Sequence, residues 1–214
     1  MKEKLIKQII DIEWPMFSSA DNEGGKAFCQ TQPRTFKIMR KSQYLSWTDE
    51  ILESYLRDLK RAVILKRNLC AEKYAFMMEM TDPVAYQKIR PLLPEVSRDV
   101  LQKIQKIVDH YIAWGELTAQ KYPALCMKGR PLKDTHDSVD VVSIETYLFC
   151  ELKTYSNYTV SLLYLYILNC CEQGINLAEM TLENTIREYG YESLEEASQI
   201  ILRSHRLSDP FCEL

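Results

Sequence analysis

The chain has 214 residues, of which 46% are hydrophobic and 27% charged, and its formal net charge is -3. This is an ordinary globular composition, long enough to bury one sizeable core or two small ones. The slightly negative charge argues against the basic surface that binding to duplex nucleic acid requires, so no nucleic-acid partner is predicted. Seven cysteines without a Cys-x-x-Cys pair argue against a disulfide framework or a zinc finger and favour a reducing, cytoplasmic compartment.

Neither the N-terminus nor the most apolar stretch predicts export or a membrane span. Lys7 and Asp11 interrupt the first apolar run, and no small-residue cleavage site follows it. The stretch from Tyr158 to Cys171 has about 14 residues, whereas a transmembrane helix needs roughly 18 or more. We therefore expect no membrane partner and interpret residues 158–171 as a buried helix.

In chain order, apolar residues at helical spacing first predict five helices, each bounded by proline or by a capping residue. The segment 18–32, which contains Gly24 and Gly25, has no periodicity and is predicted to be a loop. The five predicted helices span about 2–14, 33–44, 49–63, 69–80 and 83–90, and the third is capped by Ser46 or Thr48 and the fourth by Asn68.

A second set of helices follows the prolines at 91 and 94. It begins with a long amphipathic helix, 98–122, and a loop at 123–142 that contains Gly129, Arg130 and Pro131. Three further helices cover about 144–155, 157–171 and 177–189, and a capping box of Ser193 and Glu196 opens the last helix. The tail from residue 205 has no pattern and is expected to fray.

Both parts of the chain read as a helix, a long loop and then four helices. Trp14 is echoed by Trp114, and Asn68 by Asn176, with a constant offset of 108 between residues 47 and 69. The predicted fold class is therefore all-α, with about ten helices in two pseudo-repeated halves, 1–92 and 97–206, packed as one compact domain with a tail at 207–214. Because β-alternation is missing, dinucleotide-binding and hydrolase folds are not expected.

Several short strings make the chain resemble a bacterial family of unknown function, domain of unknown function 4125. The resemblance covers most of the chain and implies a shared fold and a bacterial cytoplasmic origin, but it implies no reaction. The strings that carry it are Ile10–Trp14, Gly24–Gln30, Thr35–Gln43, Asn68–Leu69 with Glu72–Tyr74, Met78–Pro83, Gly129–Pro131, Glu145–Leu148 and Leu182–Thr185.

Three glutamates fall inside or beside apolar helical stripes: Glu13, Glu151 and Glu183. A carboxylate in such a place must be paired or hydrogen-bonded. Their convergence would indicate an acid–base pair or a metal site, with Glu13 and Glu183 as catalytic candidates. The alternative is three separate glutamates, each with its own partner. A ferritin-like di-metal centre is not expected, because no glutamate has a histidine three residues later.

The loop around Asp134, His136 and Asp137 offers carboxylates and an imidazole to a divalent cation. It lacks the turn glycine and the terminal glutamate of a calcium loop, and the alternative is an ordinary polar loop. No metal and no cofactor is predicted.

Cys29 is the sharpest candidate for a catalytic nucleophile. It precedes a helix start, where the helix dipole favours a thiolate, and Gly24 and Gly25 would let the backbone approach a ligand. The sequence offers no histidine partner at a telling distance, and the alternative is a cysteine that only packs.

Arg40, Gln43 and Arg130 are candidate ligand-binding residues, together with Glu151. If the halves are symmetric, the two long loops occupy equivalent positions, and arginine from one loop and glycine backbone from the other would hold an anion. The alternative is that these side chains cap helices and fasten loops.

These patterns leave three functions open. The favoured one is a module that binds a small molecule or a protein, because no complete catalytic constellation is visible. The second is an enzyme that uses Cys29, or buried glutamates with Arg40. The third is a helical accessory to a nucleotidyltransferase-like partner. Convergence of Glu13, Glu183 and Arg40 in a pocket would favour an enzyme or a ligand-binding protein, and their dispersal would favour protein interaction. The oligomeric state is not predicted.

Overall fold

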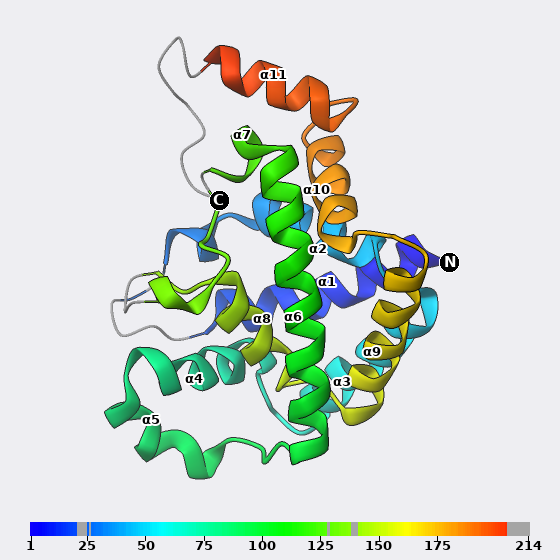
Figure 1. Ribbon diagram of the computed structural model, residues 1–214. Coiled ribbons are helices and arrows are strands. Elements are labelled where there is room, and N and C mark those ends of the chain that lie inside the picture. Colours follow the sequence, from blue (N-terminus) through cyan, green and yellow to red (C-terminus); the bar gives the residue numbers. More distant parts are fainter. Residues whose placement is uncertain (21–24, 26, 128, 138–140, 205–214) are drawn as a thin grey trace.

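The computed structural model describes residues 1–20, 25, 27–127, 129–137 and 141–204, apart from the side chains of residues 136 and 204. Within these ranges it contains helices and connecting turns but no strand, so the predicted all-α fold class is confirmed (Figure 1). The α-helices are α1 (Lys2–Ser18), α2 (Pro33–Leu45), α3 (Asp49–Ile64), α4 (Leu69–Thr81), α5 (Pro83–Ile89), α6 (Arg98–Lys121), α7 (Pro123–Cys126), α8 (Ile144–Leu152), α9 (Asn157–Glu172), α10 (Leu177–Glu188) and α11 (Leu194–Ser204). None of the helices in these ranges combines the length and apolarity needed to cross a membrane.

Capping side chains begin most of these helices, and the predicted caps Thr48 and Asn68 are among them. In each case a side-chain oxygen accepts a hydrogen bond from the backbone N–H three residues later, which satisfies one of the unpaired donors of the first turn. The side chains that do so are Thr48, Asn68, Asp82, Ser97, Ser143, Ser156 and Asn176.

Some predicted boundaries were wrong. α1 continues through Pro15 to Ser18 instead of ending at Trp14. Proline this close to the end of a helix loses only one backbone bond, while the last turn buries Met16 and Phe17 and the Ser19 N–H donates to the carbonyl of Pro15. The two predicted loops also hold short helices, namely the 3-10 helices Phe28–Thr31 and Asp134–His136 and the four-residue α7.

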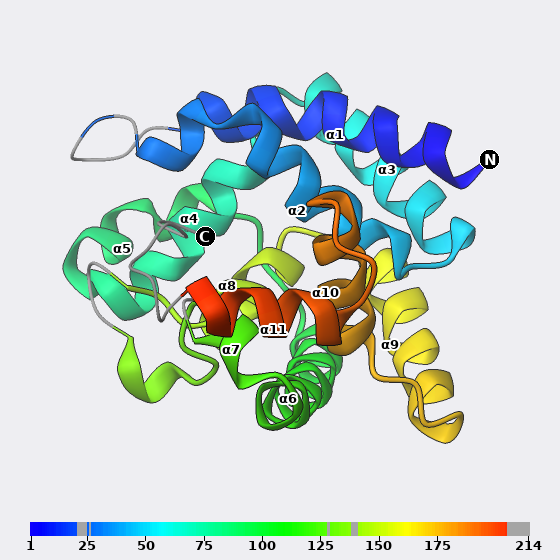
Figure 2. The same ribbon diagram turned by 90° about the horizontal axis from the view of Figure 1, so that it is seen from above.

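The main core lies where α1 packs on α3, α6 packs on α9 and α3 packs on α9. Figure 1 shows α6 lengthwise as a long vertical rod, and Figure 2 shows it end-on. Its apolar stripe packs on α9 and joins those of α1 and α3 in one cluster of buried side chains, as amphipathic patterning at helical spacing predicts. The fully buried side chains there include Ile6, Ile9, Leu52, Leu59, Ile104, Ile107, Leu163 and Ile167.

Local features recur between the halves: the donor asparagines and the turn residues are 108 positions apart, and the acceptor carbonyls are 98 positions apart. Asn68 donates its amide to the carbonyl of Met16 in α1, and Asn176 does the same to Trp114 in α6. α3 is followed by Lys66 with φ 55°, and α9 is followed by Gly174 with φ 68°. These matches support the predicted duplication, which stays a prediction.

Helices of the two halves pack on each other. α2 packs on α10, and α4 packs on α8, and both views place these pairs side by side. Each pair joins one helix of residues 1–92 to one helix of residues 97–206. The α4–α8 pair, with α1 and α2, encloses the polar cluster described next.

Candidate functional site: a buried charged cluster

Glu13 lies on the buried face of α1 and is only 1% exposed. Its Oε1 accepts hydrogen bonds from the hydroxyls of Tyr44 and Tyr55, each at 2.7 Å, and from Arg40. Its Oε2 accepts from Arg40 Nε at 3.0 Å. The prediction that this carboxylate needs partners is therefore confirmed, and the partners are a bidentate arginine and two phenols.

Arg40, on α2, connects both buried carboxylates. Its Nη1 donates to Glu151 Oε1 at 2.8 Å and to Gln43 Oε1 at 3.0 Å, while Nη2 donates to Glu13 and to the Tyr44 hydroxyl. With the Nε bond to Glu13, all five guanidinium N–H groups have an acceptor. Arg40 and Gln43 thus fasten this cluster, and Arg40 keeps no donor for a ligand.

Glu151, on α8, has one carboxylate oxygen that accepts two hydrogen bonds and a second oxygen whose contacts are longer. Oε1 accepts from Arg40 and from the Tyr155 hydroxyl at 2.9 Å. Lys73 Nζ lies 3.7 Å from Oε2. This separation is too long for a direct hydrogen bond.

Lys73 is the charged residue that the sequence reasoning missed. It lies on α4 in line with Leu69, Phe76 and Met77, and a lysine at that spacing on an apolar stripe was a signal available from the sequence. Its side chain is 5% exposed. Nζ donates to the Tyr147 hydroxyl and lies 3.9 Å from the centre of that ring. An ammonium has three donors, and the other two have no hydrogen-bond acceptor among the described residues.

Electrostatic interactions hold these groups in their charged forms. Burial alone would raise the pKa of Glu151, but Arg40 and Lys73 outweigh it and lower that pKa to about 2. Burial would likewise lower the pKa of Lys73, but Tyr147 and Glu151 raise it above its usual value. Burial raises the pKa of Tyr44, Tyr55 and Tyr155, so these phenols stay protonated hydrogen-bond donors.

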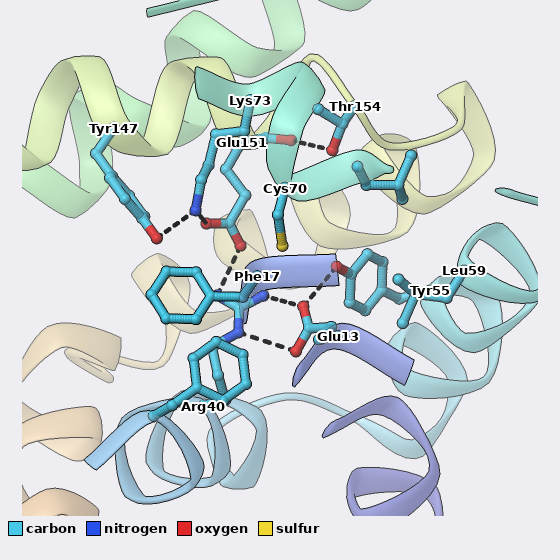
Figure 3. Close-up of a pocket in the computed structure, with 12 residues that line it drawn as sticks. Glu13, Phe17, Arg40, Tyr55, Leu59, Cys70, Lys73, Tyr147, Glu151 and Thr154 are labelled. Atoms are coloured by element: carbon cyan, nitrogen blue, oxygen red, sulfur yellow. Dashed lines mark hydrogen bonds and ion pairs between the residues drawn. The ribbon is translucent and has the colours of Figure 1, made fainter. Parts of the chain in front are cut away.

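A cavity of about 20 Å³ lies between these side chains (Figure 3). This volume suits one water-sized group. The lining residues are Glu13, Phe17, Phe36, Arg40, Tyr55, Leu59, Leu69, Cys70, Lys73, Tyr147, Glu151 and Thr154. Figure 3 shows Lys73 and Glu151 on one wall, Glu13 and Tyr55 on the other, and the Cys70 sulfur pointing between them. Burial raises the pKa of Cys70 to about 11, which keeps it a neutral thiol.

The remaining candidates lie elsewhere. Glu183 pairs with Arg187 at 2.5 Å, with its side chain 41% exposed. Arg130 donates to the carbonyl of Val142 and lies 5.3 Å from the Tyr147 ring, outside the cavity lining. Gly25 and Cys29 are exposed and do not line the cavity. Gly24 lies outside the described residues.

The candidate cation ligands are also separate from the cavity. Asp137 accepts hydrogen bonds from the Ser143 N–H and the Thr146 hydroxyl, and Asp134 is exposed. The side chain of His136 lies outside the described part of the structure. Within that part, no group of three or more histidine, cysteine or carboxylate side chains is placed to hold a metal ion.

Sequence and structure comparisons give one match. No curated protein and no solved structure matches the chain. A family model described as "Protein of unknown function (DUF4125)" matches residues 3–199. The strings around Glu13, Arg40, Lys73 and Glu151 all lie inside this match, as does every residue that lines the cavity. The chain belongs to the family of proteins of unknown function DUF4125.

Proposed function

We propose that the protein is a small-molecule-binding module whose ligand enters the cavity beside Lys73. The observation that carries this proposal is the state of the two groups facing the cavity. Lys73 keeps two N–H donors without an acceptor among the described residues, and its Nζ lies 3.7 Å from Glu151 Oε2, beyond a direct hydrogen bond. Because buried polar groups normally have hydrogen-bond partners, this pair is prepared for a group that the protein itself does not supply.

The other half of the chain offers an internal comparison. At the offset of 108, the counterparts of Arg40, Tyr55 and Lys73 are Leu148, Leu163 and Thr181, and Glu151 is itself the counterpart of Gln43. The backbone makes the same hydrogen bonds at Gln43 and at Glu151. The Gln43 carbonyl accepts from the N–H and the hydroxyl of Ser46, and the Glu151 carbonyl accepts from the N–H and the hydroxyl of Thr154. In the predicted duplication, leucines and a threonine stand where the first half has Arg40, Tyr55 and Lys73, which supports a role for the charged residues other than helix packing.

The alternatives are less well supported by the geometry. An enzyme built on Cys29 would use an exposed thiol outside the cavity, and Cys70 inside the cavity is held as the neutral thiol. Binding to a protein, the role of accessory to a nucleotidyltransferase-like partner, and cytoplasmic location stay predictions.

Co-purification tests the proposal. The protein is purified under non-denaturing conditions from cells that naturally make it, and bound molecules are detected by native mass spectrometry. We expect a stoichiometric small molecule on the wild type that is lost from Cys70→Met, because the longer side chain fills the cavity while all charges remain. The matched control is Cys150→Met, a buried cysteine in a different cluster, which should retain the molecule. Retention by Cys70→Met, or a wild type without any bound molecule, would contradict the proposal.

A further inference from the structure

The charges around the cavity sum to zero. Two carboxylates, Glu13 and Glu151, face two cations, Arg40 and Lys73, and all four side chains are at most 12% exposed. The three phenols that complete the cluster stay neutral. An anionic ligand would leave one negative charge buried without compensation, and a cationic ligand one positive charge. Either state carries a desolvation cost that a neutral ligand avoids.

The two groups with free capacity also specify what they bind. Lys73 supplies donors only, and Glu151 Oε2 supplies an acceptor only. They are 3.7 Å apart, so a single oxygen about 2.8 Å from each can bridge them. That oxygen must accept one hydrogen bond and donate another, which both a water molecule and the hydroxyl group of a ligand can do.

The size and the walls of the cavity restrict the rest of the ligand. A volume of about 20 Å³ admits the hydroxyl itself but no larger polar group. Phe36, Cys70 and Tyr147 are lining residues that keep more exposure than the buried charges, so we place the route from the cavity to the surface beside them. A ligand body that follows its hydroxyl outward therefore meets aromatic rings, because Phe36 is stacked on Phe17 with ring centres 4.8 Å apart.

We propose that the ligand of this site is a neutral alcohol with an apolar or aromatic body, its hydroxyl bridging Lys73 Nζ and Glu151 Oε2 and its body packing on Phe36. This assignment rests on the proposed function, since it names the ligand class of the same cavity.

Three probes of matched shape test the ligand class: benzyl alcohol, benzoate and benzylamine, which are neutral, anionic and cationic at neutral pH. The readout is the indole N–H signal of Trp14 in nitrogen-15 correlation spectra, because its ring lies 5.3 Å from that of Phe36. Trp114 provides an internal control. We expect benzyl alcohol to shift the Trp14 signal saturably and to bind at least about tenfold tighter than either charged probe.

Charge variants sharpen the same experiment. Glu151→Gln leaves the cluster with one excess positive charge and should reverse the ranking in favour of benzoate, and Lys73→Met should reverse it in favour of benzylamine. Glu183→Gln, at a partly exposed carboxylate outside the cavity, should keep the wild-type ranking. Where a variant loses its dispersed spectrum, the wild-type ranking alone decides. Tightest binding of a charged probe to the wild type would overturn the neutral-alcohol assignment and leave the cavity a binding site. No response to any probe would also overturn it, and the co-purification experiment would decide the proposed function independently.

Discussion

Arg40 holds the cluster together because one planar guanidinium can serve two carboxylates at once. It reaches Glu13 through Nε and Nη2 and Glu151 through Nη1, with its side chain 12% exposed. A lysine has a single donor atom and cannot reproduce this fork. Removing Arg40 alone leaves two carboxylates buried without their main partner, whereas replacing the whole cluster with apolar residues leaves no buried charge unpaired.

We expect Arg40→Met to lower the free energy of unfolding by about 3–5 kcal/mol, the range typical when one partner of a buried ion pair is removed. Urea unfolding followed by circular dichroism measures this change. The control is Arg187→Met, which removes the partly exposed pair with Glu183 and should cost less than about 1 kcal/mol. Equal losses in the two variants would show that the buried cluster contributes no more than a surface pair.

The lowered pKa of Glu151 predicts a specific dependence of stability on pH. Since the pKa is about 2 in the folded protein and 4.5 is its ordinary value, the unfolded chain takes up the proton first as the pH falls. The carboxylate therefore contributes on the order of 3 kcal/mol above pH 4.5, and this contribution is lost as the pH falls from 4.5 towards 2.

Unfolding free energies of the wild type and Glu151→Gln, measured from about pH 6 to about pH 3, test this dependence. The difference between the two proteins should narrow as the pH falls. Glu183→Gln should differ from the wild type by a small and constant amount, because an exposed pair contributes little. A gap between wild type and Glu151→Gln that stays constant with pH would contradict the prediction.

At the scale of the helices, the ends of α3 and α9 make the same turn with different residues. Lys66 adopts φ 55° and Gly174 adopts φ 68°. In each case the N–H of the following residue donates to the carbonyl five residues before that residue, at Ala62 or Cys170. The left-handed conformation is strained for a residue with a Cβ and free for glycine. Lys66 therefore carries strain that its counterpart avoids.

Exchanging the residue type at these two positions tests this difference. Lys66→Gly should raise the free energy of unfolding by about 1 kcal/mol, and Gly174→Lys should lower it by about 1 kcal/mol. A Cβ at Gly174 would meet no atom within 4 Å, so the effect there reports backbone strain and not a clash. Thermal unfolding measures both, and a loss of stability in Lys66→Gly would show that the lysine side chain outweighs the strain.

The sequence predicts the helix ends of this protein better than it predicts the candidate site. The caps at Thr48, Asn68 and Ser156 were predictable because each depends on a few neighbouring residues. Glu13 and Glu151 were predicted as candidates because they lie on apolar stripes, and Arg40 as a ligand-binding candidate. That these three residues meet could not be predicted, since which helix faces meet depends on helix packing. Glu183 was wrongly grouped with them, because its helix, α10, presents that residue to Arg187 and solvent.

Lys73 and the tyrosines were missed for a related reason. The stripe of α4 was interpreted as apolar, and a long amphipathic side chain on such a stripe is usually expected to extend towards water. Lys73 is retained inside by Tyr147 and Glu151, and both of these belong to α8, 74 and 78 residues further along the chain. No local pattern reports a partner at that distance.

At the scale of the whole molecule, the halves complete each other. Arg40 and Lys73 belong to residues 1–92, and Glu151 belongs to residues 97–206. The α2–α10 and α4–α8 contacts cross the same boundary. Neither half alone can pair all of its buried charges, which favours the interpretation of the chain as one domain with a single cooperative unfolding transition.

Separate expression of residues 1–92 and 97–206 tests that interpretation. We expect each fragment alone to lack cooperative unfolding and dispersed tryptophan signals, although part of its helical content remains. Mixing the two should restore the environments of Trp14, Trp47 and Trp114 seen in the intact chain, as nitrogen-15 spectra would show. Cooperative unfolding of the isolated first fragment would instead indicate two independent domains.

The sequence separation between Arg40 and Glu151 also determines when the cluster can form during synthesis of the chain. The two residues are 111 positions apart, so Glu13, Arg40 and Lys73 leave the ribosome well before their last partner. At ~5–20 residues per second, the nascent chain spends several seconds or more with two cations and only one carboxylate available for its future interior. Final burial of the cluster must await the emergence of α8, so the pocket cannot close until the chain has been made past Leu152.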